Sequence, residues 1–175
     1  YDAKGLLNTA LENKNPVLFV EHRELYTAKG DVPEGYYKVP FGEAAIRREG
    51  KDVTIVATAS MVTKSLTVAE ELADGGIDIE VIDPRTLCPL DTKTIINSVK
   101  KTGRLVTVDE GCKTSGFGSE IAAIIAEEAI DYLQGPIVRI AGPMAPVGKS
   151  APLEKAFVPD EKKIKEGVAK ALRSA

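Results

Sequence analysis

Short apolar segments typical of buried strands alternate with amphipathic segments typical of helices along most of this chain. The strand-like segments are residues 53–57, 77–82, 105–108 and 137–140. The helix-like segments are residues 61–74, residues 91–101, a stretch that begins after Gly116, and residues 160–173. Strands separated by helices are joined by crossovers, which is typical of a parallel sheet. We therefore predict an α/β fold of three layers, a mostly parallel sheet with helices on both faces.

The first forty residues break this alternation. One face of a helix predicted over residues 3–13 carries four apolar side chains, Leu6, Leu7, Ala10 and Leu11. Pro16 forbids continuation of that helix, and residues 17–20 are predicted as a short buried strand. Residues 22–40 hold three tyrosines, two prolines and two glycines, which is typical of a connection between layers or domains. One helix and one strand are too few to fold alone, so we expect this opening segment to end a preceding domain.

Composition excludes several classes of protein. A length of 175 residues fits one ordinary domain, and a net charge of −3 gives no electrostatic reason to expect nucleic acid. No apolar run approaches the roughly 20 residues that cross a bilayer, so no membrane partner is expected. The first residues have no signal-peptide pattern. The two cysteines, Cys88 and Cys112, do not make a disulfide framework, which favours a reducing cytoplasm.

Polar residues follow several of the predicted strands. In open parallel sheets ligands bind beyond the carboxyl ends of the strands, and Ser60, Arg85, Asp109 and Glu110 fall there. Asp109 and Glu110 have the chemistry of an acid and a base, and Arg85 that of an anion ligand. The alternative is that these residues make turns, caps and ion pairs where loops begin, and this structural role is the one we favour. His22, the only histidine, follows the strand predicted at 17–20, and we expect it to make a structural hydrogen bond.

Two further motifs have both a binding and a structural interpretation. The glycines of Gly116-Phe-Gly-Ser119 precede a helix, where free N–H groups can hold phosphate. The full GxGxxG spacing is missing, so close packing is the better interpretation. The helix end near Leu11 exposes carbonyl oxygens, and Asn13 and Asn15 follow it. Hard cations prefer such oxygen ligands, although an ordinary asparagine-capped helix end explains the same residues.

Several segments, in order and spacing, resemble a known enzyme family. The run from Asp83 to Asp91, DPRTLCPLD, resembles a crossover in the carboxy-terminal domain of transketolase-like thiamine diphosphate enzymes. Other segments that carry the resemblance are residues 41–45, 52–57, 103–110, 140–143 and 152–154. More narrowly, the whole chain resembles the beta subunit of 2-oxo acid and acetoin dehydrogenases. His22-Arg-Glu-Leu-Tyr26 and Lys29-Gly-Asp-Val-Pro33 look more like the acetoin type.

The resemblance implies a division of the chain and of labour. Residues 1–22 would be a remnant of the pyrimidine-binding domain, residues 23–40 an interdomain linker and residues 41–175 a transketolase carboxy-terminal-like domain. The resemblance implies that thiamine diphosphate and Mg²⁺ would belong to the parent enzyme, and that the family's catalytic and cofactor-binding positions have no counterpart in this sequence. The resemblance therefore implies part of an oxidoreductase, acting on acetoin, pyruvate or another 2-oxo acid, that is inactive alone and serves assembly.

The same resemblance implies partners and one ion. The partners would be the alpha subunit of the dehydrogenase, a second beta subunit and the lipoyl acyltransferase core. Related beta subunits hold a structural potassium ion partly at the corresponding helix end. The matching positions in this sequence are Ala10, Leu11, Asn13 and Asn15. Asn13 stands where an aspartate is often found, which should weaken the site. The alternatives are a flavodoxin-like module that binds a nucleotide or acyl-CoA, or the equivalent domain of transketolase or deoxyxylulose phosphate synthase.

Overall fold

The computed structural model describes residues 1–173 and contains a sheet of five strands. The strands are β1 (Ala45–Arg48), β2 (Val53–Ala57), β3 (Ile79–Asp83), β4 (Leu105–Cys112) and β5 (Val138–Gly142), in the order β1-β3-β2-β4-β5. β2, β3, β4 and β5 pair in parallel, and only the edge strand β1 is antiparallel to its neighbour. The predicted mostly parallel sheet is confirmed. Residues 174–175, with which the domain predicted at 41–175 ends, lie outside the described residues.

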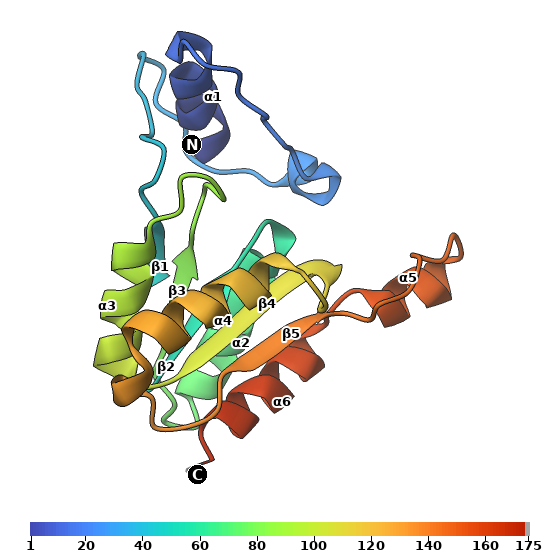
Figure 1. The fold of residues 1–175 in the computed structure, drawn as a ribbon. Helices are drawn as coiled ribbons and strands as arrows, with labels where there is room; N and C mark the ends of the chain where they lie inside the picture. The colour runs from blue at the N-terminus through green and yellow to red at the C-terminus, as the bar shows by residue number, and fades with distance from the viewer. Residues whose placement is uncertain (174–175) are drawn as a thin grey trace.

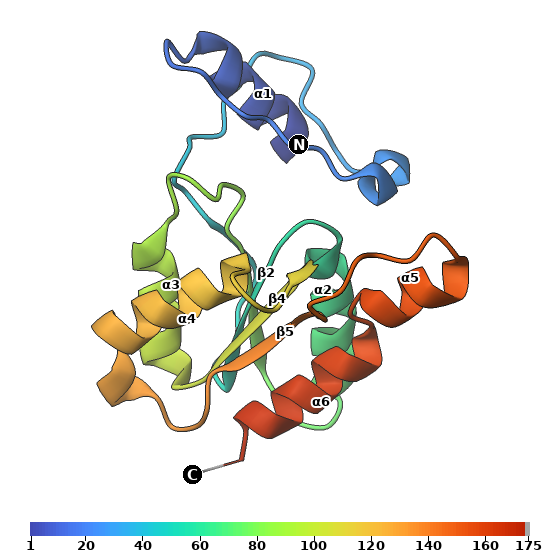
Figure 2. The ribbon, with the colours of Figure 1, turned by 45° about the vertical axis from the view of Figure 1, so that its right-hand side comes forward.

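Helices cover both faces of this sheet (Figures 1 and 2). Strand order and contacts place α2 (Ser60–Ala73) and α6 (Glu161–Ala171) on one face, and α3 (Thr92–Thr102) and α4 (Phe117–Glu128) on the other. A short helix, α5 (Ala151–Phe157), projects away from the sheet (Figure 1). The three-layer α/β fold predicted from the sequence is therefore correct. Among the described residues, no helix combines the length and the apolar character needed to cross a membrane.

Each face of the sheet has its own hydrophobic core. Val53, Ile55 and Val81 pack toward α2 and α6, whereas Val56 and Ile82 pack toward α3 and α4. Successive strand residues point to opposite faces, so a strand buried on both sides is a continuous apolar run. All five residues of β2 are buried, as its sequence Val-Thr-Ile-Val-Ala requires. Thr54 is accommodated because its hydroxyl is hydrogen-bonded to those of Ser98 and Thr102, at 2.6 and 2.7 Å.

Residues 1–40 lie beyond the end of the sheet at which the parallel strands have their carboxyl ends (Figure 1). We call this end the carboxyl edge of the sheet. They contain α1 (Asp2–Glu12) and a short 3₁₀ helix, η1 (Arg23–Thr27). The returning chain packs on α1: the Val39 N–H donates to the Gly5 carbonyl at 3.1 Å, and the side chain of Thr9 donates to the Val39 carbonyl at 2.7 Å. Gly5 allows this approach, since a Cβ there would collide with Val39. In α1, Gly5 is the only buried residue.

The strand predicted at residues 17–20 is wrong. The segment forms no strand, and most of its side chains are exposed, Leu18 by 91% and Val20 by 80%, whereas Phe19 is half-buried. A strand needs a neighbouring edge for its hydrogen bonds, and none of the described strands reaches this segment. β1, α5 and a second 3₁₀ helix, η2 (Ile130–Tyr132), were not predicted. The helix after Gly116 was predicted to carry Leu133, but it ends at Glu128, so Leu133 lies beyond it.

Candidate functional site

The strand order creates a topological switch point between β2 and β4. The crossover from β2 leads to β3 on one side, and the crossover from β3 leads to β4 on the other side of β2. The two chains therefore leave the carboxyl ends of β2 and β4 toward opposite faces. Ligands of open α/β sheets bind in the crevice that such a reversal opens. This edge is where Ser60 and Glu110 were expected.

Ser60, Glu110 and His22 meet at this switch point. Ser60 begins α2 directly after β2, and its hydroxyl donates a hydrogen bond to Glu110 Oε1. The other carboxylate oxygen, Oε2, lies 2.7 Å from His22 Nε2. The two side chains of this pair are about a quarter exposed, 25% for His22 and 27% for Glu110. A carboxylate held between a hydroxyl and an imidazole is oriented on both oxygens, and it can exchange a proton with the imidazole.

The backbone beside Ser60 is strained. Ala59 precedes α2 with φ 49° and ψ −126°, a backbone conformation that residues other than glycine rarely adopt. The turn holds the amino terminus of α2 at the crevice and points the Ser60 hydroxyl toward β4. Such outliers persist where the surrounding structure imposes them, and they gather at functional sites. The strain is therefore a second mark of this crevice, independent of the polar side chains.

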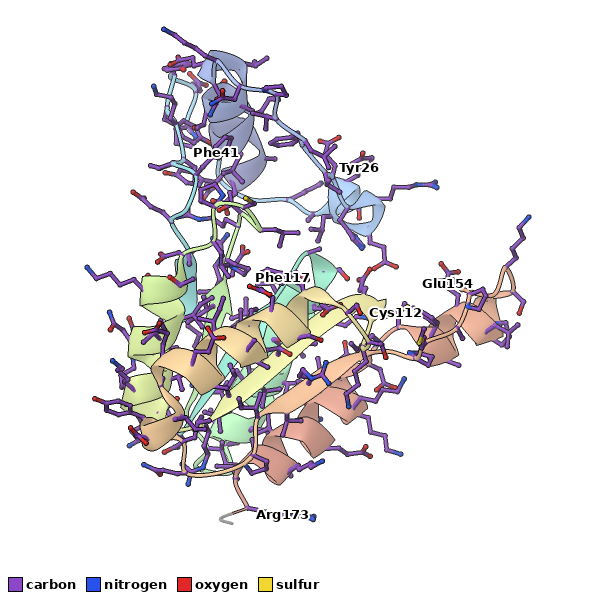
Figure 3. All side chains as sticks on the ribbon, viewed as in Figure 1. Tyr26, Phe41, Cys112, Phe117, Glu154 and Arg173 are labelled. Atoms are coloured by element: carbon purple, nitrogen blue, oxygen red, sulfur yellow. The ribbon has the colours of Figure 1, made fainter. Side chains whose placement is uncertain are left out.

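A large cleft separates the opening segment from the sheet edge. Its volume is about 1250 Å³, and most of its lining is apolar in type. Residues 13–25 line one side, whereas residues 58–66 and 83–89 line the other. His22 and Ala59 both belong to the lining, so the cleft opens onto the switch point. Figure 3 shows Cys112 at the end of β4 and Tyr26 on η1, across the cleft from the sheet.

Asp109 does not join Glu110 as an acid–base pair. The carboxylate of Asp109 accepts the Gly118 N–H at 3.4 Å, at the start of α4. The Ser119 N–H is also used, because it donates to the Gly116 carbonyl at 2.9 Å. A Cβ at Gly116 would collide with the Cys112 carbonyl, and one at Gly118 with the Thr107 hydroxyl. The glycine-rich turn is thus packed against the chain's own atoms, with a carboxylate beside it, and does not fit a phosphate.

Arg85 binds the chain's own oxygen atoms. Its guanidinium donates to the carbonyls of Glu43 and Ala44 at 2.9 and 3.3 Å, and it forms an ion pair with Asp2 at 3.2 Å. Arg47 pairs with the same Asp2 and with Asp83. The structural role favoured for Arg85 agrees with these contacts. The group also connects the start of α1 to β1 and β3.

The pKa of Asp2 reports on this connection. Burial by itself would raise the pKa of the Asp2 carboxyl, but the hydrogen bonds and charges of Arg47 and Arg85 outweigh burial and lower it. A carboxylate with a depressed pKa stabilises the arrangement in which its partners hold it. The opening segment is therefore fixed at two points: Asp2 at one end of the cleft, and His22 at the other.

The residues proposed for potassium lie at the end of α1. The Asn13 N–H donates to the Ala10 carbonyl at 3.2 Å, and the Asn13 side-chain oxygen accepts the Asn15 N–H at 2.9 Å. Leu11 is exposed, and Asn13 and Asn15 border the cleft. Two of the candidate oxygen atoms already accept internal hydrogen bonds. Since a hard cation such as Ca²⁺ takes about 6–8 oxygen ligands, these residues alone do not complete a site.

The approach of His22 to Glu110 was not predictable from the sequence. The two residues are 88 positions apart, and His22 lies in a segment with little regular structure. The sequence placed Glu110 at the sheet edge, and Ser60 beside it, because each follows an apolar strand. Nothing in the local pattern indicates that η1 returns over the end of β4.

Comparison with known proteins shows which family the chain is similar to. Residues 42–164 match the family model described as the transketolase C-terminal domain. The chain is 45% identical over 164 residues to subunit beta of acetoin:2,6-dichlorophenolindophenol oxidoreductase from Bacillus subtilis, covering 94% of this chain and 48% of that protein. It is 48% identical over 169 residues to the pyruvate dehydrogenase E1 component subunit beta of Rickettsia felis, covering 97% and 52%.

A solved structure agrees with both matches. A split-gene transketolase, described as an inactive beta4 tetramer, aligns with a TM-score of 0.65 and 33% identity. The alignment covers 81% of this chain and 46% of that one. The chain spans about half the length of the relatives that it matches, and it corresponds to their carboxy-terminal part.

Proposed function

The chain belongs to the transketolase carboxy-terminal domain family, and from this we propose that it works within a thiamine-diphosphate-dependent dehydrogenase component of a lipoyl multienzyme complex. Its place there is the carboxy-terminal part of the beta subunit. The observation that carries this proposal is the 45–48% identity, over nearly the whole chain, to beta subunits of acetoin and pyruvate dehydrogenases. The two identities are too similar to choose a substrate, so acetoin, pyruvate and other 2-oxo acids are all candidates.

We propose that this part of the enzyme serves assembly and not chemistry. Thiamine diphosphate supplies the chemistry that splits a 2-oxo acid or acetoin, and a protein positions it. The glycine-rich turn of this chain does not fit its diphosphate, since Asp109 lies against that turn. We assign the cofactor and its Mg²⁺ to other parts of the enzyme. The domain proposed at 41–175 would then be an assembly module, with residues 1–22 belonging to the pyrimidine-binding domain and residues 23–40 linking the two.

A hybrid beta subunit tests the proposal. In it, this chain replaces the matching carboxy-terminal part of the Bacillus subtilis subunit beta, and the hybrid is combined with the corresponding alpha subunit. We expect reduction of 2,6-dichlorophenolindophenol that depends on thiamine diphosphate and on acetoin or pyruvate. The matched control is the same subunit without the replaced part. A folded hybrid that binds the alpha subunit and shows no activity with any of these substrates contradicts the proposal.

The isolated chain gives a complementary test. Calorimetric titration with thiamine diphosphate and Mg²⁺ should show no specific heat, because the glycine-rich turn at residues 116–119 is packed against the chain's own atoms. The intact Bacillus subtilis oxidoreductase serves as the positive control. Binding to the chain at micromolar concentration would overturn its assignment as a non-catalytic part.

We also propose that the module pairs with a second beta subunit and contributes to docking on the acyltransferase core. Large apolar side chains are exposed on α5 and on the loop that precedes it: Met144, Val147 and Leu153. Exposed apolar side chains that gather on one segment are typical of interaction sites. Sedimentation of the chain at tens of micromolar should show concentration-dependent association, and a strict monomer there would contradict this part of the proposal.

Potassium binding stays a prediction for the complete subunit. Ala10, Leu11, Asn13 and Asn15 would supply part of the oxygen ligands, and other segments of the enzyme the rest. The hybrid subunit should then be more heat-stable in KCl than in NaCl at equal ionic strength. Asn13→Ala should remove that difference. The isolated chain, with its incomplete ligand set, should show no such preference.

A further inference from the structure

The side chains at the switch point could also bind a metal ion. His22, Glu24 and Glu110 present one nitrogen and two carboxylate oxygens that all lie within 4.8 Å of one another. The residues come from two parts of the chain, η1 with its preceding residue and the end of β4. Their meeting is therefore a product of the fold and not of local sequence.

The charges of this cluster are not balanced by basic side chains. Within residues 1–173, neither Glu24 nor Glu110 has a lysine or arginine in a salt bridge, and His22 is the partner of Glu110. The Lys and Arg pairs of the described residues lie elsewhere, on Asp2, Glu12, Glu49, Glu71, Asp78, Glu80 and Asp83. Two carboxylates beside an imidazole therefore leave a local negative charge that a divalent cation would neutralise.

The type of ligand indicates the metal. Imidazole nitrogen with carboxylate oxygen suits Zn²⁺, which binds both at about 2.0–2.2 Å. Tetrahedral ligands at that radius lie roughly 3.4 Å from one another, so displacements of the ligand atoms by at most about 1.4 Å would close the cluster around an ion. Ser60 donates to the carboxylate oxygen of Glu110 that faces away from His22. A hydrogen bond of this kind orients a carboxylate ligand from behind.

We propose that His22, Glu24 and Glu110 bind one Zn²⁺ ion and that the ion fixes η1 over the carboxyl ends of β2 and β4. Three protein ligands leave one position of a tetrahedral site for water. The ion takes the place of the direct contact between His22 and Glu110, and it attaches the opening segment more firmly than that contact does. The proposal is independent of the proposed function, because it concerns the chain alone.

Zinc titration of the isolated chain tests the proposal. Calorimetry with ZnCl₂ in a buffer that does not chelate metal should show one equivalent bound per chain. Glu24→Gln is the decisive variant, because Glu24 is exposed and its loss leaves folding intact. We expect at least a tenfold weaker affinity in Glu24→Gln and in His22→Asn. Zinc should also raise the Tm of the wild-type chain, and not that of Glu24→Gln.

Two matched controls keep the result specific. Glu21→Gln removes a neighbouring carboxylate that hydrogen-bonds to Tyr26 at 3.2 Å, and it should leave the affinity unchanged. Cys112→Ser removes the nearest alternative soft ligand in sequence and should also have no effect. The absence of saturable binding overturns the proposal. Binding that survives Glu24→Gln and His22→Asn unchanged, or that is lost in Cys112→Ser, overturns it as well.

Discussion

The α/β domain and the opening segment of this chain are held together by different forces. Residues 41–173, which contain the sheet and its helices, bury two apolar cores, one on each face of the sheet. Residues 1–40 contribute Gly5 and Val39 as their buried positions, and their other large apolar side chains are at least partly exposed. Hydrogen bonds and ion pairs attach this segment to the sheet edge. Apolar burial contributes in proportion to the area removed from water, whereas ion pairs near the surface are screened by salt and contribute little each. The two regions should therefore respond differently to the same challenge.

The largest expected difference is in hydrogen exchange. Amides of β2 and β4 should open only with global unfolding, which costs about 5–15 kcal/mol in most domains. Amides of α1 should exchange through local opening, because an 11-residue helix with one buried residue has little to hold it closed. Native-state exchange monitored by NMR measures both. Equal protection of α1 and β2 would show that the opening segment is an integral part of the domain.

Two substitutions by alanine should show the same difference in stability between the two regions. Ile55 is 0% exposed at the centre of β2, and Leu11 in α1 is 76% exposed. Ile55→Ala should lower the free energy of unfolding by about 2–5 kcal/mol, through lost burial and a cavity. Leu11→Ala should change it by less than about 0.5 kcal/mol. Urea denaturation measures both values. A comparable loss in the two variants would mean that α1 is packed against a surface of similar extent.

The same physical difference explains what the sequence could predict. Residues 53–57 and 105–108 are nearly continuous apolar runs, each with one threonine, and such runs are strands when both faces are covered. Residues 17–20 carry the same local pattern and are no strand, because no partner edge is present among the described strands. Ala45-Ile-Arg-Arg48 forms β1 at an edge, where one neighbour and solvent replace the apolar pattern. Local sequence does not contain the presence or absence of a neighbouring strand.

The residues of the candidate site also differ in how well the sequence could predict their positions. The sequence placed Ser60 and Glu110 at the carboxyl edge because each comes soon after a well-marked apolar segment, 53–57 or 105–108. In the structure Glu110 lies near the end of β4 itself. It assigned His22 a structural hydrogen bond, and the structure contains one, to Glu110 at 2.7 Å. The identity of that partner depends on how η1 returns across the cleft. That path is set by contacts such as Asp2 with Arg47 and Arg85, which no periodic pattern encodes.

Relief of the backbone strain at Ala59 should have a smaller effect, and it should raise the free energy of unfolding instead of lowering it. Ala59 has φ 49°, and backbone strain of this kind costs about 1–3 kcal/mol. Glycine removes the strain and adds about 0.4–1 kcal/mol of unfolded-chain entropy, so Ala59→Gly should stabilise the domain by about 1 kcal/mol. Ala123→Gly, at an exposed position in α4, is the matched control and should destabilise by about 1 kcal/mol. Loss of stability in both variants would mean that Ala59 is not strained.

The smallest effect is expected at the Asp2 contact. The side chains of Asp2, Arg47 and Arg85 are half-buried at the surface. Ion pairs near the surface contribute about 0.2–1 kcal/mol each, and α1 can open locally, so Asp2→Asn should change the global free energy of unfolding by no more than about 1 kcal/mol. It should instead loosen α1 from β1, because Arg47 and Arg85 lose the charge that they share. Nitrogen-15 relaxation should show faster local motion of α1 amides in this variant. Glu12→Gln is the control, since Glu12 pairs with Lys38 inside the opening segment.

Acid should reproduce that effect in the wild-type chain. The pKa of Asp2 is lowered in the folded protein, so its stabilisation is complete above the ordinary aspartate pKa of about 3.9 and is lost as pH falls through the lower folded value. The mobility of α1 should therefore increase below about pH 4, whereas β2 stays protected until the cores unfold. In Asp2→Asn the α1 amides should already be mobile at neutral pH, with no further step near the pKa of Asp2. An acid transition of α1 at the same pH in both proteins would show that another carboxylate holds the opening segment in place.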